Sequence, residues 1–215
     1  MITLHGYWRS TAAYRVRIAL NYKQLAYESV SVHLVKNGGD QHSEEYQSLN
    51  PQSLVPTLVD NDFVLGQSMA ILEYLNEKYP QHNLMPRDIN LRATVRQFCQ
   101  VIAADLHPLN NLRVLGYLSN ELKISDDERM NWYHHWLKSG LDAYQKLIRK
   151  YNFSGEYTLG RELTMADACL IPQIYNARRF DFSLERYSKL ESIEQHCLSL
   201  DCFNKAIPEN QPDAN

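Results

Sequence analysis

The pattern of apolar and polar positions changes character near residue 80 of this 215-residue chain. Before that point, short apolar runs alternate with helix-like stretches. Residues 2–5 form an apolar run suited to a buried strand, and residues 12–22 place apolar side chains on one helical face. Residues 27–32 alternate between apolar and polar with a period of two, which is typical of a second strand. The segment therefore predicts a βαβ unit with a right-handed crossover.

The next part of the chain adds two more strands and a helix. A polar stretch at 33–50 predicts a loop with a short helix near its end. Two β-rich triplets at 57–59 and 63–65 flank an Asp-Asn-Asp turn, which predicts an antiparallel hairpin. Ser68 is suited to N-cap a following helix, and Pro80 ends it. The order β-α-β, then β-β-α, is that of an α/β thioredoxin-like domain.

Helix signals dominate the rest of the chain. Sequences of the capping-box type begin at Ser125 and at Thr164, each before an apolar periodic stretch. The pattern predicts a thioredoxin-like domain at 1–79, a linker at 80–90 and an all-α domain at 91–215.

The composition of the chain argues against several classes of function. A formal net charge of −3 argues against a general nucleic-acid binder, which needs a basic face. No apolar run reaches the ~18 residues of a membrane span, and the N-terminus lacks the pattern of a secretion signal. The four cysteines show neither zinc spacing nor a disulfide framework. We expect a reduced cytoplasmic protein without a structural metal.

The first candidate for chemistry is a pair of hydroxyls at the turn from the first strand into the first helix. Ser10 and Thr11 stand there, where the first N–H groups of the helix have no partner within it. An anion at this helix end is stabilised by those N–H groups and by the helix dipole. The alternative is that Ser10 is an ordinary N-cap.

Two further segments have the same ambiguity. In Val55-Pro56, a cis peptide bond presents the backbone N–H and C=O of Val55 to an extended ligand, whereas the commoner trans bond indicates an ordinary turn. Gln67 and Ser68 open the helix after the hairpin, where N–H groups and a hydroxyl can hold a carboxylate. Simple capping by Ser68 is again the alternative.

Taken together and in this order, the three segments resemble the glutathione transferase superfamily, and most closely its zeta class. The zeta signature is Ser-Ser-Cys followed, after two residues, by Arg-Val-Arg-Ile-Ala-Leu; here Ser10-Thr-Ala is followed by Ala-Tyr and then Arg-Val-Arg-Ile-Ala-Leu ending at residue 20. The segments 105–113, 163–167 and 177–180 also look like that family, so the resemblance covers nearly the whole chain. It implies the glutathione transferase architecture.

The resemblance also implies a cofactor and a set of site residues. Ser10 corresponds to the hydroxyl that hydrogen-bonds the sulfur of glutathione, and the candidate catalytic residues are Ser10, Arg9 and Thr11. The positions that correspond to glutathione-binding or pocket-lining residues are Ser10, Thr11, Gln41, Val55, Pro56, Gln67, Ser68, Asp105, His107, Asn111 and Arg113. Two departures matter: the second serine is Thr11, and the cysteine is Ala12, which leaves no protein thiol there.

The implied partners are glutathione, a small dicarboxylate and a second copy of the chain. Members of the family are homodimers, and Asp105 corresponds to a residue that reaches the glutathione amine of the partner subunit. Cations should bind the substrate carboxylates, with Arg9 as first choice and Arg113, Arg178 or Arg179 next. The alternative for each arginine is an ordinary surface charge.

The expected reaction is a glutathione-dependent cis–trans isomerisation, as in the maleylacetoacetate isomerases of aromatic amino acid breakdown. A maleylpyruvate isomerase and a non-catalytic scaffold of the same fold remain as alternatives. We interpret His107 as part of a polar pocket wall rather than a metal ligand, because no further ligand stands at a suitable spacing. Tyr7 is expected to pack in the core, so Ser10 is the better candidate for thiol activation.

Overall fold

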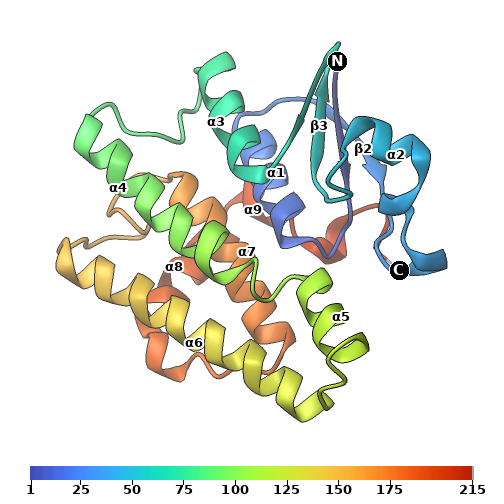
Figure 1. Ribbon diagram of the computed structural model, residues 1–215. Coiled ribbons are helices and arrows are strands. Elements are labelled where there is room, and N and C mark those ends of the chain that lie inside the picture. Colours follow the sequence, from blue (N-terminus) through green and yellow to red (C-terminus); the bar gives the residue numbers. More distant parts are fainter. Residues whose placement is uncertain (215) are drawn as a thin grey trace. The chain divides into compact units, whose positions relative to one another are not determined.

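The computed structural model of the chain describes residues 1–214, except for the side chain of Asn37. The chain forms two compact units. One comprises residues 1–84 together with the chain from 198 onward, and the other comprises residues 85–197. The colours of Figure 1 follow the chain through both units.

The first unit has the thioredoxin-like fold that the sequence predicts. Its strands are β1 (Ile2–Gly6), β2 (Tyr27–Ser31), β3 (Thr57–Asp60) and β4 (Phe63–Gly66), and its helices are α1 (Thr11–Tyr22), η1 (Lys36–Gly38), η2 (Asp40–His42), α2 (Glu44–Leu49), α3 (Ser68–Lys78), α9 (Asp201–Asn204) and η5 (Pro208–Asn210).

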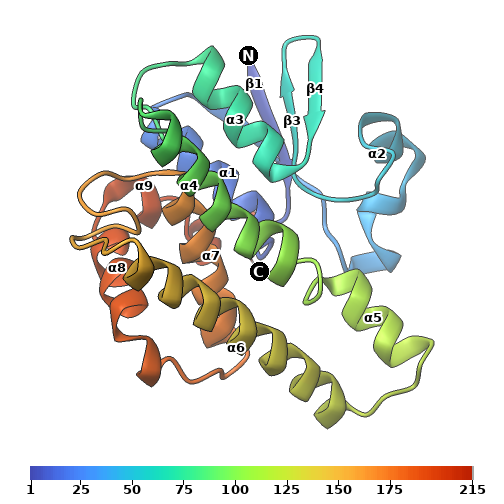
Figure 2. The ribbon, with the colours of Figure 1, turned by 60° about the vertical axis from the view of Figure 1, so that its left-hand side comes forward.

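The four strands form one mixed sheet in the order β2-β1-β3-β4. Strand β1 is parallel to β2 and antiparallel to β3, and β3 is antiparallel to β4 as the predicted hairpin requires. Helices α1 and α3 contact each other and lie on one side of the sheet, as Figure 2 shows. Apolar side chains of α1 and α3 are buried between the helices and the sheet, which places the core of this unit there.

The second unit is built of helices joined by loops. Its elements are α4 (Ile89–Gln100), η3 (Val101–Leu106), α5 (Leu112–Asn120), α6 (Asp126–Lys150), α7 (Met165–Arg179), η4 (Glu185–Tyr187) and α8 (Ser188–Leu198). Helices α6 and α7 both begin with a complete capping box, at Ser125 and Thr164 as predicted. Within residues 1–214, no helix combines the length and the apolar character that crossing a membrane requires.

The end of the chain differs from the sequence-based division. The pattern assigns 91–215 to one helical domain, but from residue 198 onward the chain packs with the first unit. Its short helix α9 contacts α1, and Phe203 and Ala206 are fully buried. The buried Arg17 of α1 also donates to the carbonyl of Ala206 at 3.1 Å. Burial of these side chains against α1 holds the segment there.

Candidate functional site

The three segments singled out in the sequence leave the sheet at the same end. In the register of the strands, Thr57 stands opposite His5 of β1 on one side and opposite Gly66 of β4 on the other. The turn that follows β1, the residues that precede β3 and the turn that follows β4 therefore emerge side by side. We call this the site end of the sheet.

Ser10 stands at the site end as the N-cap of α1. Its Oγ accepts a hydrogen bond from the N–H of Ala13 at 3.2 Å. A hydroxyl has one proton to donate and two acceptor positions, so this bond leaves the proton of Ser10 for another acceptor. Capping and sulfur binding are thus compatible, and the cap orients the hydroxyl. The first turn of α1 carries no acidic residue that would repel an anion.

Arg9 lies beside Ser10 with its guanidinium over a neighbouring ring. Its Cζ is 4.1 Å from the centroid of the Trp8 indole, and the side chain is exposed. Contact with an indole face attracts the cation and limits where the guanidinium can lie. Within the described chain no carboxylate forms an ion pair with Arg9, so its donors are available to a carboxylate of a ligand.

The Val55–Pro56 peptide bond is cis, not the commoner trans form. Within residues 1–214, the N–H and the C=O of Val55 have no hydrogen-bond partner. The neighbouring Leu54 carbonyl, by contrast, accepts from the Tyr46 hydroxyl at 2.7 Å and from the Asn50 amide at 2.8 Å. The backbone of Val55 is therefore the part of this segment that a ligand can engage.

Tyr46 and Asn50 are supporting residues that the sequence reasoning missed. Both also hydrogen-bond the buried Thr57 hydroxyl, so they hold the chain on either side of Val55. Burial raises the pKa of the Tyr46 phenol, which keeps it protonated as a donor. The signal in the sequence was slight, since a tyrosine and an asparagine in a short helix have many ordinary roles.

The start of α3 differs from the expected cap. Gln67, with φ of 65°, is the N-cap and makes no side-chain capping bond, and Ser68 is the first helical residue. The buried Oγ of Ser68 accepts from Nη1 of Arg15 at 3.2 Å. The structure thus corrects the simple-cap alternative for Ser68. The start of α3 is left without a side-chain cap, above a buried guanidinium that favours an anion.

Arg15 is another residue that the sequence reasoning missed. Its charged side chain is only 1% exposed, whereas the other buried residues of α1 are mostly apolar. The available signal was the position of Arg15 inside the apolar pattern of the first predicted helix.

Gln41 and Thr11 are both buried in the first unit. The Oε1 atom of Gln41 has no hydrogen-bond partner among the described residues, while its Nε2 atom lies 3.4 Å from the Leu34 carbonyl. A buried acceptor without a partner is costly unless a donor from outside the chain reaches it. Thr11, the first residue of α1, is 2% exposed. Like the open backbone of Val55, the Oε1 atom of Gln41 can accept a hydrogen bond from a bound ligand.

The remaining candidate glutathione residues belong to the helical unit. Asp105 is exposed in η3, and His107 is half-buried directly after it. Asn111 caps α5, accepting from the N–H of Arg113 at 3.1 Å, and Arg113 is exposed.

The two arginines at the end of α7 are in different environments. Arg178 forms a bidentate pair with Glu194 at 2.6–3.2 Å and also bonds Glu191 at 3.2 Å. Those carboxylates raise its pKa and engage its Nε and Nη2 atoms. The expected substrate role of Arg178 is therefore corrected, because its guanidinium is paired within the protein. Arg179 is exposed, and its Cζ lies 4.9 Å from the centroid of the Phe180 ring.

Tyr7 packs as expected. It is 9% exposed and its ring makes an edge contact with His33 at 4.9 Å between centroids. Among the described residues, no group of His, Cys, Asp or Glu side chains has a metal-binding arrangement.

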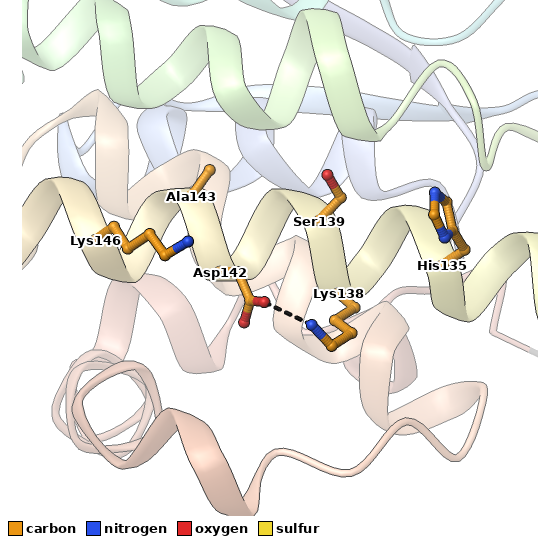
Figure 3. Close-up of a pocket in the computed structure, with 6 residues that line it drawn as sticks. All are labelled: His135, Lys138, Ser139, Asp142, Ala143 and Lys146. Carbon is orange, nitrogen blue, oxygen red and sulfur yellow. Dashed lines mark hydrogen bonds and ion pairs between the residues drawn. The ribbon is translucent and has the colours of Figure 1, made fainter.

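A hollow of about 470 Å³ on α6 gathers none of the predicted site residues (Figure 3). The residues that line it are His135, Lys138, Ser139, Asp142, Ala143 and Lys146. Lys138 and Asp142 neutralise each other in an ion pair of 2.8 Å. This hollow is therefore not part of the candidate site.

Comparison with known proteins gives the family. Residues 4–83 match the model of the glutathione S-transferase N-terminal domain. The chain is 49% identical to the probable maleylacetoacetate isomerase of Vibrio cholerae, over 99% of this chain and 98% of the relative.

Two solved structures are similar over nearly the full length. One is a holo maleylpyruvate isomerase described as a bacterial glutathione S-transferase of the zeta class, with a TM-score of 0.95, 38% identity, and coverage of 99% of this chain and 100% of that one. The other is the maleylacetoacetate isomerase of Methylobacterium extorquens with bound malonate and glutathione, with a TM-score of 0.94, 35% identity, and coverage of 99% of both chains. The chain therefore belongs to the glutathione transferase superfamily and, within it, to the zeta-class family of maleylacetoacetate isomerases and their relatives.

Proposed function

We propose that this protein is a glutathione-dependent cis–trans isomerase that converts maleylacetoacetate to fumarylacetoacetate in aromatic amino acid breakdown. The observation that carries the proposal is the hydroxyl of Ser10, fixed at the start of α1 with its proton left to donate. Relatives that share this chain's full length are named for the same reaction.

The reaction needs a nucleophile that adds to a conjugated double bond and leaves again, because rotation about an intact double bond is too slow. Bound glutathione supplies a thiolate, whose transient addition makes the bond single and whose elimination restores it. A free thiol has a pKa of ~8.5, so little of it is ionised at neutral pH. Ser10 and the start of α1 stabilise the thiolate by a hydrogen bond and by the helix dipole.

The chain's own residues also orient the tripeptide and the substrate. The backbone of Val55 and the side chain of Gln41 hold the extended backbone of glutathione, and the start of α3 at Gln67 and Ser68 holds a carboxylate. Arg9 binds a carboxylate of the substrate. The family resemblance adds Thr11, Pro56, Asp105, His107, Asn111 and Arg113 to the glutathione site, and Arg113 and Arg179 to the substrate side.

The proposal includes a homodimer in the cytoplasm. A cytosolic glutathione pool is kept mostly reduced, which the reaction requires. Asp105 is exposed and acidic, which suits the family's contact with the glutathione amine of the partner subunit. Sedimentation of the purified chain at several concentrations tests the dimer, and Asp105→Asn tests the contact through the KM for glutathione.

A maleylpyruvate isomerase is the second candidate, and the likeness to a solved maleylpyruvate isomerase favours it. Arg9 suits the carboxylates of both substrates. The discriminating experiment is turnover of both maleyl compounds by the purified protein, with and without added glutathione. The proposal predicts turnover that requires glutathione and a higher kcat/KM for maleylacetoacetate. Preference for maleylpyruvate supports the second candidate, and absence of turnover with both compounds supports a non-catalytic scaffold.

A further inference from the structure

The end of the chain touches the turn that carries Ser10. An Oδ2 atom of Asp213 accepts a hydrogen bond from the backbone N–H of Trp8 at 3.2 Å. The same oxygen accepts from the Ser31 hydroxyl at 2.9 Å, at the end of β2. Figure 1 shows this last segment in red, returning to the sheet from which the chain began. Asp213 is therefore a bridge between β2 and the turn after β1.

The carbonyl side of the Trp8 backbone is held as well. The carbonyl of Trp8 accepts from Nη2 of Arg17 at 3.0 Å, and Nε of Arg17 donates to the carbonyl of Ala206 at 3.1 Å. Arg17 is 3% exposed. The backbone of Trp8 is thus fixed through its N–H by Asp213 and through its C=O by Arg17, and Arg17 is itself bonded to the C-terminal segment at Ala206.

The position of Trp8 sets that of Ser10. The N–H of Ser10 donates to the carbonyl of Tyr7 at 2.9 Å, which closes a tight turn over residues 7–10. Because the turn is closed, a shift of the Trp8 backbone moves Ser10 and the guanidinium of Arg9, which lies over the Trp8 ring. The stabilisation of a developing charge by a hydroxyl is sensitive to displacements of about 1 Å.

We infer that Asp213 and Arg17 are positioning residues, through which the C-terminal segment holds the 7–10 turn in the geometry that lets Ser10 reach a bound thiol. The inference rests on the proposed function for its catalytic part. Its structural part, the support of the Trp8 amide by Asp213, stands independently of any activity. Asp213 bonds the Trp8 backbone and not Ser10 itself, so its effect passes through the 7–10 turn.

The test compares Asp213→Ala with Asp213→Asn and with a matched control, Asp201→Ala. Asp201 lies in the same segment, but its carboxylate is exposed and pairs with Lys205 one turn away at 2.6 Å. Asn keeps an acceptor oxygen for the Trp8 N–H and removes the charge. We expect Asp213→Ala to speed hydrogen exchange at the Trp8 amide. We also expect it to lower kcat by about fivefold, as loss of one hydrogen bond predicts. The pH profile of kcat should shift towards higher pH. Asp213→Asn should restore most of each property.

Three results overturn the inference. They are a Trp8 exchange rate in Asp213→Ala equal to that of Asp201→Ala, a kcat and pH profile equal to those of the control, and no rescue by Asn. If Asp213→Ala is not recovered folded, Ser31→Ala takes its place, because it removes one support of Asp213 and should give smaller changes in the same directions. Failure of the proposed function is distinguishable, because the wild-type protein would then lack isomerase activity while the exchange measurement at Trp8 still decides the structural part.

Discussion

The two ends of the sheet in the first unit differ in how fully their polar groups are used. At the end opposite the site, the carboxylate of Asp60 is 3% exposed and accepts from Lys78 at 2.9 Å, Tyr79 at 2.7 Å and Tyr74 at 3.0 Å. Burial by itself raises the pKa of this carboxyl, but those hydrogen bonds more than offset burial and hold the pKa below its usual value. Neighbouring side chains thus satisfy the Asp60 carboxylate with hydrogen bonds.

At the site end, polar groups are instead held in place without using their full bonding capacity. Ser10 has a proton to donate after capping α1, the backbone of Val55 is open, and α3 begins without a side-chain cap. Buried polar groups are normally satisfied, so such a concentration at one end indicates a ligand surface. Changes at the far end should therefore affect stability, and changes at the site end should affect catalysis.

The largest expected effect is on catalysis at the site end. Ser10→Ala removes a hydrogen bond to a charged sulfur, which is worth about 1.5–3 kcal/mol, or roughly ten- to hundred-fold in kcat/KM. The measurement is steady-state isomerisation at saturating glutathione. Ser125→Ala is the control, since Ser125 caps α6 in the other unit. Equal activity of the two variants would remove Ser10 from the mechanism.

The matching change at the far end is Asp60→Asn. It replaces a charged acceptor of several hydrogen bonds by a neutral one, so we expect the free energy of unfolding to fall by about 1–3 kcal/mol with kcat unchanged. Denaturant unfolding measures the first quantity. Asp62→Asn, in the exposed turn between β3 and β4, should change neither. A loss of kcat without a loss of stability in Asp60→Asn would break the division between the two ends.

A smaller catalytic effect is expected at the start of α3. Ser68→Ala removes the acceptor of the Arg15 bond and a donor to a bound carboxylate. The KM for glutathione should rise about tenfold with little change in kcat, as loss of one charge-assisted bond predicts. The same kinetics with Ser192→Ala, on α8, provide the baseline. A fall in kcat at constant KM would instead connect Ser68 with the chemical step.

In the helical unit, the neighbouring arginines of α7 differ in their contacts. Arg178 is paired with carboxylates, whereas Arg179 is exposed over the Phe180 ring. Arg179→Ala should raise the KM for the maleyl substrate several-fold without changing the unfolding temperature. Arg178→Ala should lower the unfolding temperature, because it leaves the buried Glu194 carboxylate without its bidentate partner, and should leave the KM unchanged. The reverse pattern would return the substrate role to Arg178.

The smallest effect is the pH dependence of stability at Asp60. Its pKa in the folded protein lies below its usual value, so its contribution is present above about pH 4 and is lost as the pH falls through the lowered pKa. The difference in unfolding free energy between wild type and Asp60→Asn should therefore be constant near neutral pH and shrink below about pH 4. A difference that grows on acidification would contradict the assigned direction.

The sequence predicts the elements of this protein better than the use of its polar side chains. Alternation and helical periodicity reflect burial, so the hairpin, the thioredoxin-like order and the two capping boxes were predictable. The return of the chain end to α1 was not, because a short helix shows no pattern that identifies the surface it packs on. Ser10 was predictable as a cap, whereas the role of Ser68 depends on the buried Arg15, which only the packing of α1 against α3 brings near it.

The same limit applies to charged groups. Nothing in the order of residues distinguishes Arg178 from Arg179, and the distinction arises from the carboxylates of α8. The family resemblance supplied the candidates for glutathione binding, and the fold of the first unit gives a physical reason for several of them.

The most direct test of the account is the ionisation of glutathione bound to the protein. Thiolate absorbance of the complex can be titrated against pH for wild type, Ser10→Ala and Ser125→Ala. We expect a bound thiol pKa clearly below the ~8.5 of a free thiol in wild type and in Ser125→Ala, and a return towards that value in Ser10→Ala. A bound thiol that titrates alike in all three proteins would contradict the role of Ser10 in ionising glutathione.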